Sequence, residues 1–212
     1  MARGKFITLE GGEAAGKSTQ IARIKAALEA RGIETVVTRE PGGTRLAELI
    51  RGLLKDEYED APCDRAELLL FLAARAQLVK NVIKPALDAG KWVVSDRFSD
   101  STFAYQGYGR GLPLDAIETA NSFACDGLKP DITFWLDVSP ETALKRRLGR
   151  EAATHTGADR FEREQAAFHE RLRAGFAALH AAEPGRIARI DANAAQDDVW
   201  EEIWTHLKPI LS

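Results

Sequence analysis

Residues 11–18 read Gly-Gly-Glu-Ala-Ala-Gly-Lys-Ser, which has the spacing G-x-x-x-x-G-K-[ST] of a phosphate-binding loop. Gly11 and Gly16 allow a tight backbone path that brings N–H groups close to an anion. In such a loop Lys17 would reach the β- and γ-phosphates of a nucleotide, and Ser18 would ligate Mg²⁺. The spacing therefore predicts a nucleotide phosphate site, and a glycine turn that binds no ligand is the alternative interpretation.

Arginines form the second group of residues that could do chemistry, because they stand at the ends or edges of predicted elements. They are Arg39, Arg51, Arg97, Arg146, Arg147 and Arg150. Several guanidinium groups at one edge of a sheet suit two phosphorylated substrates held end to end, since each can bind phosphate oxygens in a bidentate fork. No N-K-x-D guanine signature occurs in the chain, which leaves a GTPase switch with little support.

The elements that must position these residues alternate between apolar strand candidates and helical patterns. The strand candidates are residues 6–9, 35–38, 92–95, 132–136 and 187–190. This alternation predicts an α/β fold with a five-stranded, mostly parallel sheet and helices on both faces. With the phosphate loop between the first strand and a helical pattern at 18–30, the fold class is that of the P-loop NTPases. Ligands are then expected at the carboxyl ends of the strands.

Length and composition set limits on organisation and partners. A chain of 212 residues with 45% apolar content is predicted to form one domain over residues 1–212. A net charge of −3 argues against a nucleic-acid partner, which normally requires a basic surface. No apolar stretch approaches the ~20 residues of a membrane span, so we expect a cytoplasmic protein without a membrane partner.

Two further segments carry organisational predictions. A long helix is predicted from about 65 to 89, and its apolar positions exceed one narrow stripe, which indicates burial on two sides. Either a dimer contact or a covering helix would explain the second buried side of this helix. Residues 149–159 show no apolar period and predict a mobile polar loop, so a short lid is expected at about 149–160.

Five longer segments carry more specific patterns. They are LEGGEAAGKST (9–19), TREPGGT (38–44), LFLAARAQ (70–77), DRF with STFAYQG (96–98 and 101–107) and PDITFWLDV (130–138). Together they resemble the bacterial thymidylate kinases over nearly the whole chain. The resemblance implies transfer of the ATP γ-phosphate to dTMP, giving dTDP and ADP, with Mg²⁺ and commonly in a homodimer. The rival interpretations are a kinase for another nucleoside monophosphate or a nucleoside, and a non-catalytic nucleotide-binding regulatory domain.

The resemblance also implies residues for the donor side of the site. ATP would contact Gly11, Gly12, Glu13, Ala14, Ala15, Gly16, Lys17, Ser18, Thr19 and Arg146. Mg²⁺ would be held by Ser18 and, through water, by Asp96. Because the acceptor is a phosphate that is largely ionised at neutral pH, no general base is required and cations should carry catalysis. The catalytic candidates are Lys17, Arg97 and Arg150.

One position in the loop departs from part of the family. Some thymidylate kinases place an arginine directly after the loop carboxylate, where this chain has Ala14. Relatives without that arginine supply the cation from the lid, and Arg150 stands at the matching spacing. Arg150 is therefore the predicted catalytic lid arginine, with Arg147 and Arg160 as competitors because this lid is longer than in shorter relatives.

The acceptor phosphate and sugar would contact a further group of side chains. By the resemblance, Arg97 would grip the acceptor phosphate, and a surface ion pair at a strand end is the alternative. Arg51 would add a second fork to that phosphate. Glu13 would lie near the 3′-hydroxyl, and the turn after Glu40 would present that carboxylate to the site or be a plain turn.

The base would lie against residues of the long helix. Phe71 and Arg75 are four residues apart and share a helix face, so Phe71 can stack on a pyrimidine while Arg75 donates to O4. Gln106 would complete base recognition, Thr102 would line the pocket and Tyr105 would crowd the ribose 2′ position. Core packing is the alternative for Phe71 and Tyr105. A methyl group is worth only ~1 to 3 kcal/mol in an apolar pocket, so these residues do not tell how strongly dTMP is preferred over dUMP.

Overall fold

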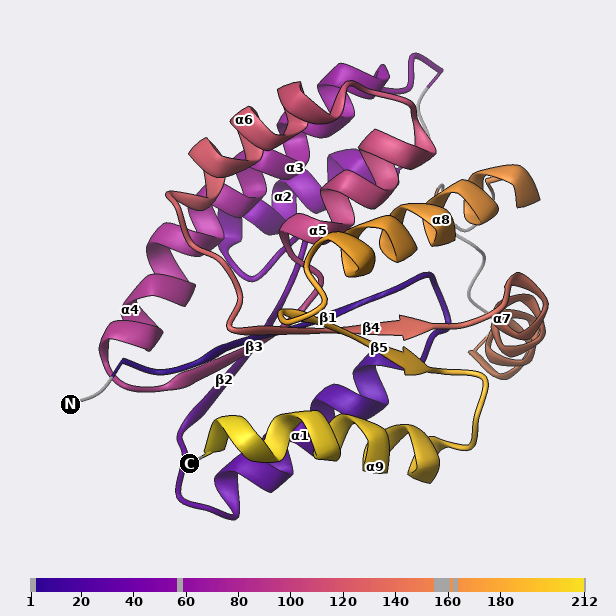
Figure 1. The fold of residues 1–212 in the computed structure, drawn as a ribbon. Coiled ribbons are helices and arrows are strands. Elements are labelled where there is room, and N and C mark those ends of the chain that lie inside the picture. Colours follow the sequence, from indigo (N-terminus) through magenta and orange to yellow (C-terminus); the bar gives the residue numbers. More distant parts are fainter. Residues whose placement is uncertain (1–2, 57–58, 155–160, 162–163, 212) are drawn as a thin grey trace.

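The computed structural model describes residues 3–56, 59–154, 161 and 164–211, without the side chains of 150–154 (Figure 1). Its strands are β1 (Phe6–Glu10), β2 (Thr35–Arg39), β3 (Trp92–Asp96), β4 (Ile132–Asp137) and β5 (Ile187–Asp191). All four neighbouring pairs are parallel, in the order β2-β3-β1-β4-β5. The predicted five-stranded sheet is confirmed, and each strand extends one residue further at its carboxyl end than predicted.

The strand order places the end of β1 at the centre of the sheet. Leu9 of β1 lies opposite Asp96 of β3, and Glu10 lies opposite Trp135 of β4. The chain leaves β1 toward β2 and β3 on one side, while β4 and β5 extend the other side. Such a reversal of strand order opens a crevice beyond the carboxyl ends of the strands. The loop after β1 and the turn after β3 therefore meet there.

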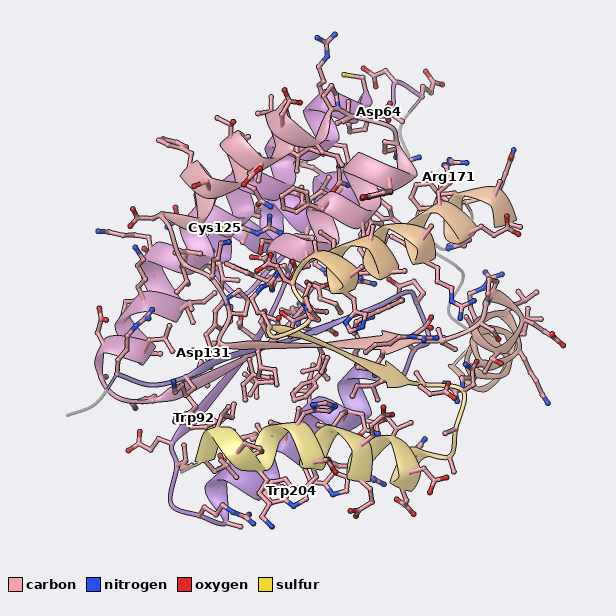
Figure 2. All side chains as sticks on the ribbon, in the orientation of Figure 1. Asp64, Trp92, Cys125, Asp131, Arg171 and Trp204 are labelled. Carbon is pink, nitrogen blue, oxygen red and sulfur yellow. The ribbon has the colours of Figure 1, made fainter. Side chains whose placement is uncertain are left out.

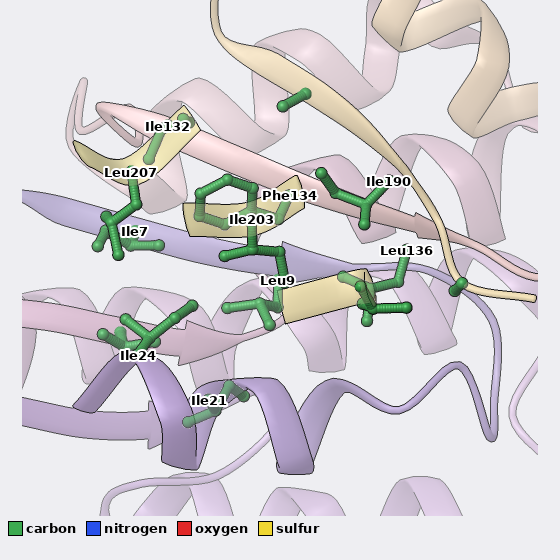
Figure 3. Packing of buried hydrophobic residues seen from close by; sticks show 14 of the residues in the cluster. Ile7, Leu9, Ile21, Ile24, Ile132, Phe134, Leu136, Ile190, Ile203 and Leu207 are labelled. Atoms are coloured by element: carbon green, nitrogen blue, oxygen red, sulfur yellow. The ribbon is translucent and has the colours of Figure 1, made fainter. Parts of the chain in front are cut away.

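Helices cover both faces of the sheet, as predicted (Figure 1). On one face, α1 (Lys17–Glu29) and α9 (Gln196–Leu207) bury apolar side chains against β1, β4 and β5. Figure 3 shows this packing, with Ile21 and Ile24 from α1 and Ile203 and Leu207 from α9. Because both faces of the central strands are buried, their sequences are almost continuously apolar.

The other face carries most of the remaining helices (Figure 1). They are α2 (Arg45–Lys55), α3 (Asp64–Leu78), α4 (Lys84–Asp88), α5 (Ser99–Thr102), α6 (Leu114–Cys125) and α8 (Ala166–Ala182). Two π-helical segments, Val79–Ile83 and Phe103–Gly109, continue α3 and α5, and a short 3₁₀ helix, Lys208–Leu211, follows α9. The predicted long helix at 65–89 is thus α3, the first π-helical segment and α4 in one run, and both α2 and α6 pack against α3.

The predicted loop at 149–159 is wrong over its first six residues. Helix α7 runs from Pro140 to Thr154 and includes them. Glu151, Ala152 and Ala153 are strong helix formers, and Gly149 costs a helix only about 1 kcal/mol, so the missing apolar period did not end the helix. Residues 155–160 lie outside the described part of the chain.

Within the described residues, none of the helices has both the length and the apolar composition that crossing a bilayer requires.

Candidate active site

The phosphate loop connects β1 directly to α1, as the sequence predicts. Gly11 and Gly16 have φ of 134° and 94°, a region that side chains rarely adopt. A Cβ at Gly11 would lie 2.5 Å from the carbonyl oxygen of Leu136, so this position has no room for a side chain. No side chain caps the start of α1, which leaves its first N–H groups available to an anion.

Lys17 lies buried across this loop. Its Nζ donates to the carbonyl oxygens of Gly12 at 3.0 Å and Gly11 at 3.4 Å. Burial, together with the nearby Arg97, lowers the pKa of Lys17. Asp96 Oδ1 lies 4.0 Å from Nζ and is buried without a hydrogen bond among the described residues. Buried polar atoms normally have a partner, so this unpaired oxygen points to a ligand or ion at the loop.

Arg97 connects the turn after β3 to the phosphate loop. Its backbone is left-handed, with φ of 71°, and its guanidinium donates to Gly11 O at 2.8 Å and Glu13 Oε1 at 2.6 Å. The side chain is only 13% exposed, so its pair with Glu13 is not a surface ion pair. Burial alone would raise the pKa of Glu13, but Arg97 and Lys17 outweigh it and lower the pKa to about 2.

One cavity of about 140 Å³ joins this cationic end to the residues predicted for the base. Its lining includes every residue predicted for the acceptor: Glu13, Glu40, Arg51, Phe71, Arg75, Arg97, Thr102, Tyr105 and Gln106. Residues from the phosphate loop, α2, α3, β3 and the second π-helical segment thus share one cleft. The Tyr105 hydroxyl is buried there without a hydrogen-bond partner among the described residues.

The base end of this cavity is held by Arg75, whose five N–H groups all have acceptors in the protein. Its Nε and Nη2 donate to the Glu40 carboxylate, with the Nη2–Oε2 distance at 2.5 Å. The other donors reach Thr102 Oγ1 at 2.7 Å, Asn121 Oδ1 at 2.5 Å and Phe98 O at 3.0 Å. Donation from Arg75 to a base therefore stays a prediction, and it would require sharing an N–H that is already bonded.

The pair between Arg75 and Glu40 is fully enclosed. Burial raises the pKa of Glu40, and Arg75 opposes that rise. The turn after Glu40 therefore directs this carboxylate toward Arg75, which lines the same cavity. Across the turn, Arg51 Nη1 donates to Pro41 O at 3.0 Å, so α2 is tied to this turn as well.

A second cavity, of about 620 Å³, opens on the other side of the loop. It is lined by loop residues through Thr19, by Asp96 and Arg146, and by the segment that leads from β5 into α9. Arg146 donates from Nη1 to Ala192 O at 2.8 Å. Of the predicted donor residues, Glu13 to Thr19 and Arg146 thus line one opening together with Ala192, while Gly11 and Gly12 do not line it.

Sequence reasoning missed Glu10, the last residue of β1. Its carboxyl is fully buried and accepts hydrogen bonds from Phe98 N at 2.8 Å, Ser101 N at 3.3 Å and Ser101 Oγ at 2.5 Å. Burial, with a contribution from Asp100, raises the pKa of Glu10 to about 8. A carboxyl that ends an apolar strand is the signal that could have identified it. Glu10 braces the turn that carries Arg97.

The lid arginines are only partly described. The side chain of Arg150 and the whole of Arg160 lie outside the described residues. Arg147, on α7, lines a third cavity of about 410 Å³ that also reaches Gly12 and Glu13. The lid arginine that faces the transferred phosphate thus stays a prediction.

Comparison with known proteins gives one consistent result. The family model for thymidylate kinase matches residues 9–203. The chain is 50% identical to the thymidylate kinase of Solidesulfovibrio magneticus over 94% of this chain and 96% of that protein. It is also 50% identical to that of Chromohalobacter salexigens over 100% and 99% of the two chains. The crystal structure of thymidylate kinase from Ehrlichia chaffeensis matches with a TM-score of 0.76 and 34% identity, over 97% and 99% of the two chains. With this similarity along its whole length and with the predicted loop and acceptor residues gathered at one edge of the sheet, the chain belongs to the thymidylate kinase family.

Proposed function

We propose that this protein transfers the γ-phosphate of ATP to dTMP, giving dTDP and ADP. The observation that carries the proposal is that the two cavities share Glu13, Lys17 and Asp96. A donor in the larger cavity and an acceptor in the smaller one would meet at Lys17, as in-line transfer between two phosphates requires. Residues 1–212 would act as one phosphate-loop domain.

On the donor side, the loop from Gly11 to Thr19 binds the ATP phosphates through its backbone N–H groups. Lys17 neutralises the oxygens of the β- and γ-phosphates as charge gathers on the transferred group. Arg146, whose Nη1 donates to Ala192 O, covers the adenine. The segment after β5 then borders the base through backbone groups.

Ser18 and Asp96 fit a Mg²⁺ site. Ser18 is exposed at the start of α1, and the unpaired Asp96 Oδ1 lines the same cavity. Among the described residues, no group of three or more His, Cys, Asp or Glu is placed to hold a metal. Mg²⁺ commonly binds through few protein ligands plus waters and phosphates, which agrees with one hydroxyl and one carboxylate. When bound, the ion neutralises charge on the β- and γ-phosphates.

On the acceptor side, Arg97 and Arg51 grip the phosphate of dTMP. Arg97 already reaches the loop and Arg51 is fixed beside the Glu40 turn, so both cations face the acceptor cavity. Glu13, ionised beside Arg97, contacts the 3′-hydroxyl. Because the acceptor is itself ionised, these residues bind and orient it without removing a proton.

The nucleoside lies at the far end of the cavity. Phe71 stacks on the thymine, an interaction worth about 1 to 3 kcal/mol per base. Gln106 and Arg75 face the polar edge of the base, with Glu40 and Thr102 holding Arg75 in place. Tyr105 restricts the ribose 2′ position. Its unpaired hydroxyl supports a place at the ligand.

Arg150 supplies a catalytic cation from the lid in addition to Lys17, because Ala14 stands where part of the family has a loop arginine. This assignment places the chain in the subgroup of the family with a lid arginine. Arg147 and Arg160 are the alternatives.

The enzyme forms a homodimer through α2 and its neighbours. Leu46, Leu49 and Leu53 lie three and four residues apart on α2 and are 49%, 64% and 47% exposed, and Leu69 on α3 is 63% exposed. Leu49→Lys should convert the dimer to a monomer in light scattering.

A coupled assay with ATP, Mg²⁺ and a panel of nucleoside monophosphates and nucleosides tests the reaction. We expect dTDP to form fastest from dTMP. Product from another monophosphate or a nucleoside alone would show a different kinase, and ATP binding without any product would show a regulatory nucleotide-binding domain.

A further inference from the structure

The side chain of Gln106 is held in one orientation at the base end of the acceptor cavity. Its Nε2 donates to Glu67 Oε1, on α3, at 2.9 Å. Both side chains are deeply buried, each with 1% of the residue exposed. In such surroundings a lost hydrogen bond is not replaced by water, so this contact controls how the amide lies.

In the contacts with Gln106 and Arg110, both oxygens of Glu67 accept hydrogen bonds. Arg110 donates to both Glu67 oxygens, each at 3.3 Å, and its Nη1 lies 2.5 Å from Glu164 Oε1. A carboxylate paired with a guanidinium has lone pairs to offer and no proton to give. If the Gln106 amide turned over, its Oε1 would face the Glu67 oxygen, and two acceptors would repel.

This arrangement leaves Gln106 Oε1 as the free polar atom of a side chain that lines the cavity. None of the described residues donates a hydrogen bond to it, and Phe71 and Arg75 line the same cavity. A ligand that meets Gln106 here meets an acceptor, so it must bring a donor.

We propose that Glu67 is a specificity-determining residue, which selects pyrimidines that carry a hydrogen on N3 by fixing the Gln106 amide with its oxygen toward the base. Thymine and uracil have such a hydrogen between two carbonyl groups. Cytosine has a lone pair on N3 and would set acceptor against acceptor. The inference rests on the proposed function, because it takes the base to lie between Phe71 and Gln106.

The experiment compares kcat/KM for dTMP and dCMP in the native enzyme and in Glu67→Gln, with ATP and Mg²⁺. A glutamine at 67 can present either an N–H or an oxygen, so the Gln106 amide becomes free to turn over. A matched hydrogen-bond pair is worth about 1–3 kcal/mol of base discrimination, and we expect the dTMP-to-dCMP ratio to fall about 5- to 150-fold.

Asp64→Asn is the matched control. Asp64 lies at the outer end of the same helix (Figure 2), and its Oδ1 is 3.7 Å from Arg110 Nε. This variant also removes one negative charge beside Arg110, but Asp64 does not bond to Gln106. The dTMP-to-dCMP ratio should stay as in the native enzyme.

An unchanged ratio in Glu67→Gln, or an equal loss of activity with both substrates, would overturn the inference and leave Glu67 a purely structural residue. If Glu67→Gln does not fold, Glu67→Gln/Arg110→Gln removes both charges together, and the same ratio decides. A native enzyme that makes no dTDP from dTMP would instead refute the proposed function.

Discussion

The two ends of the acceptor cavity are built in opposite ways. At the phosphate end, Asp96 Oδ1 has no hydrogen-bond partner among the described residues, and the start of α1 has no side-chain cap. At the base end, Arg75 has an acceptor for every N–H, and Glu67 has donors from Gln106 and Arg110. The phosphate end keeps polar groups available for its ligands, while the charged groups at the base end are already paired with one another.

This difference separates two uses of buried charge. Unpaired groups at the phosphate end have interactions available for polyanions whose charge changes during the reaction. Paired groups at the base end fix a shape and a pattern of donors and acceptors before any ligand arrives. Substitutions at the phosphate end should therefore reduce activity more than stability, and those at the base end should do the reverse.

Arg150→Ala should give the largest effect and leave stability unchanged. If Arg150 faces the transferred phosphate, its loss should lower kcat by about 10³-fold or more, with little change in the KM for dTMP. Steady-state kinetics measure the effect of this substitution on activity, and the melting temperature measures its effect on stability. A normal kcat in Arg150→Ala, with a reduced kcat in Arg147→Ala or Arg160→Ala, would move the role to that residue.

Arg75→Met should instead act on stability. It leaves the buried Glu40 without its cation, and breaking a buried ion pair costs about 3–5 kcal/mol in the free energy of unfolding. Urea denaturation measures this loss. The control is Arg23→Met, because Arg23 pairs with Asp197 at the surface and should change stability by no more than about 1 kcal/mol. Equal losses in the two variants would contradict a base end held together by its own charges.

Arg97→Met tests the phosphate end with an arginine that is also paired. We expect kcat/KM for dTMP to fall by about 10²- to 10³-fold, because one aligned cation is lost from the transferring phosphates. Its partner Glu13 is 32% exposed and can be solvated, so the loss of stability should be smaller than in Arg75→Met. Arg97→Lys keeps the charge but loses the bidentate guanidinium, so its kcat/KM for dTMP should lie between those of the native enzyme and Arg97→Met. A stability loss as large as that of Arg75→Met would remove the contrast between the two ends.

Glu10→Gln should change how stability depends on pH. Because the pKa of Glu10 is raised from its usual 4.5 to about 8, the folded protein keeps a proton that the unfolded chain releases over that range. This contribution to stability is full below about pH 4.5 and is lost as the pH rises toward 8. Denaturation at several pH values should show a flatter dependence in Glu10→Gln between these limits.

Glu34→Gln is the control for that experiment, since Glu34 is an exposed carboxylate paired with Lys91 whose pKa is lowered by this contact. Between pH 5 and 8, the free energy of unfolding of Glu34→Gln should change with pH as steeply as that of the native protein. If the free energy of unfolding of Glu10→Gln depended on pH as steeply as that of the native protein, Glu10 would not hold this proton.

Local sequence patterns were sufficient to predict part of the site. The two glycines act through their backbone angles, and Lys17 acts through the length of its side chain. All three lie within eight consecutive residues, so their spacing was sufficient to predict the phosphate loop. Phe71 and Arg75 were placed on one face by helical periodicity alone. The expected loop was wrong over residues 149–154, because residues with high helix propensity continue α7 there without an apolar period. Glu10 was overlooked because nothing in its neighbours along the chain reveals what packs against it.

By itself, the sequence determined the phosphate loop and the five strands, because each of these depends on residues that are neighbours along the chain. The side chains expected at the acceptor were named by the resemblance to the thymidylate kinases, and the fold brings them together from the phosphate loop, α2, α3, β3 and the second π-helical segment. Only the tertiary structure decided which of those side chains are already paired. Glu40 meets Arg75, and Glu67 meets Gln106, across more than 30 residues of sequence. Whether a charged or amide group is free for a ligand depends on partners of this kind, and the packing of the helices on the sheet supplies them.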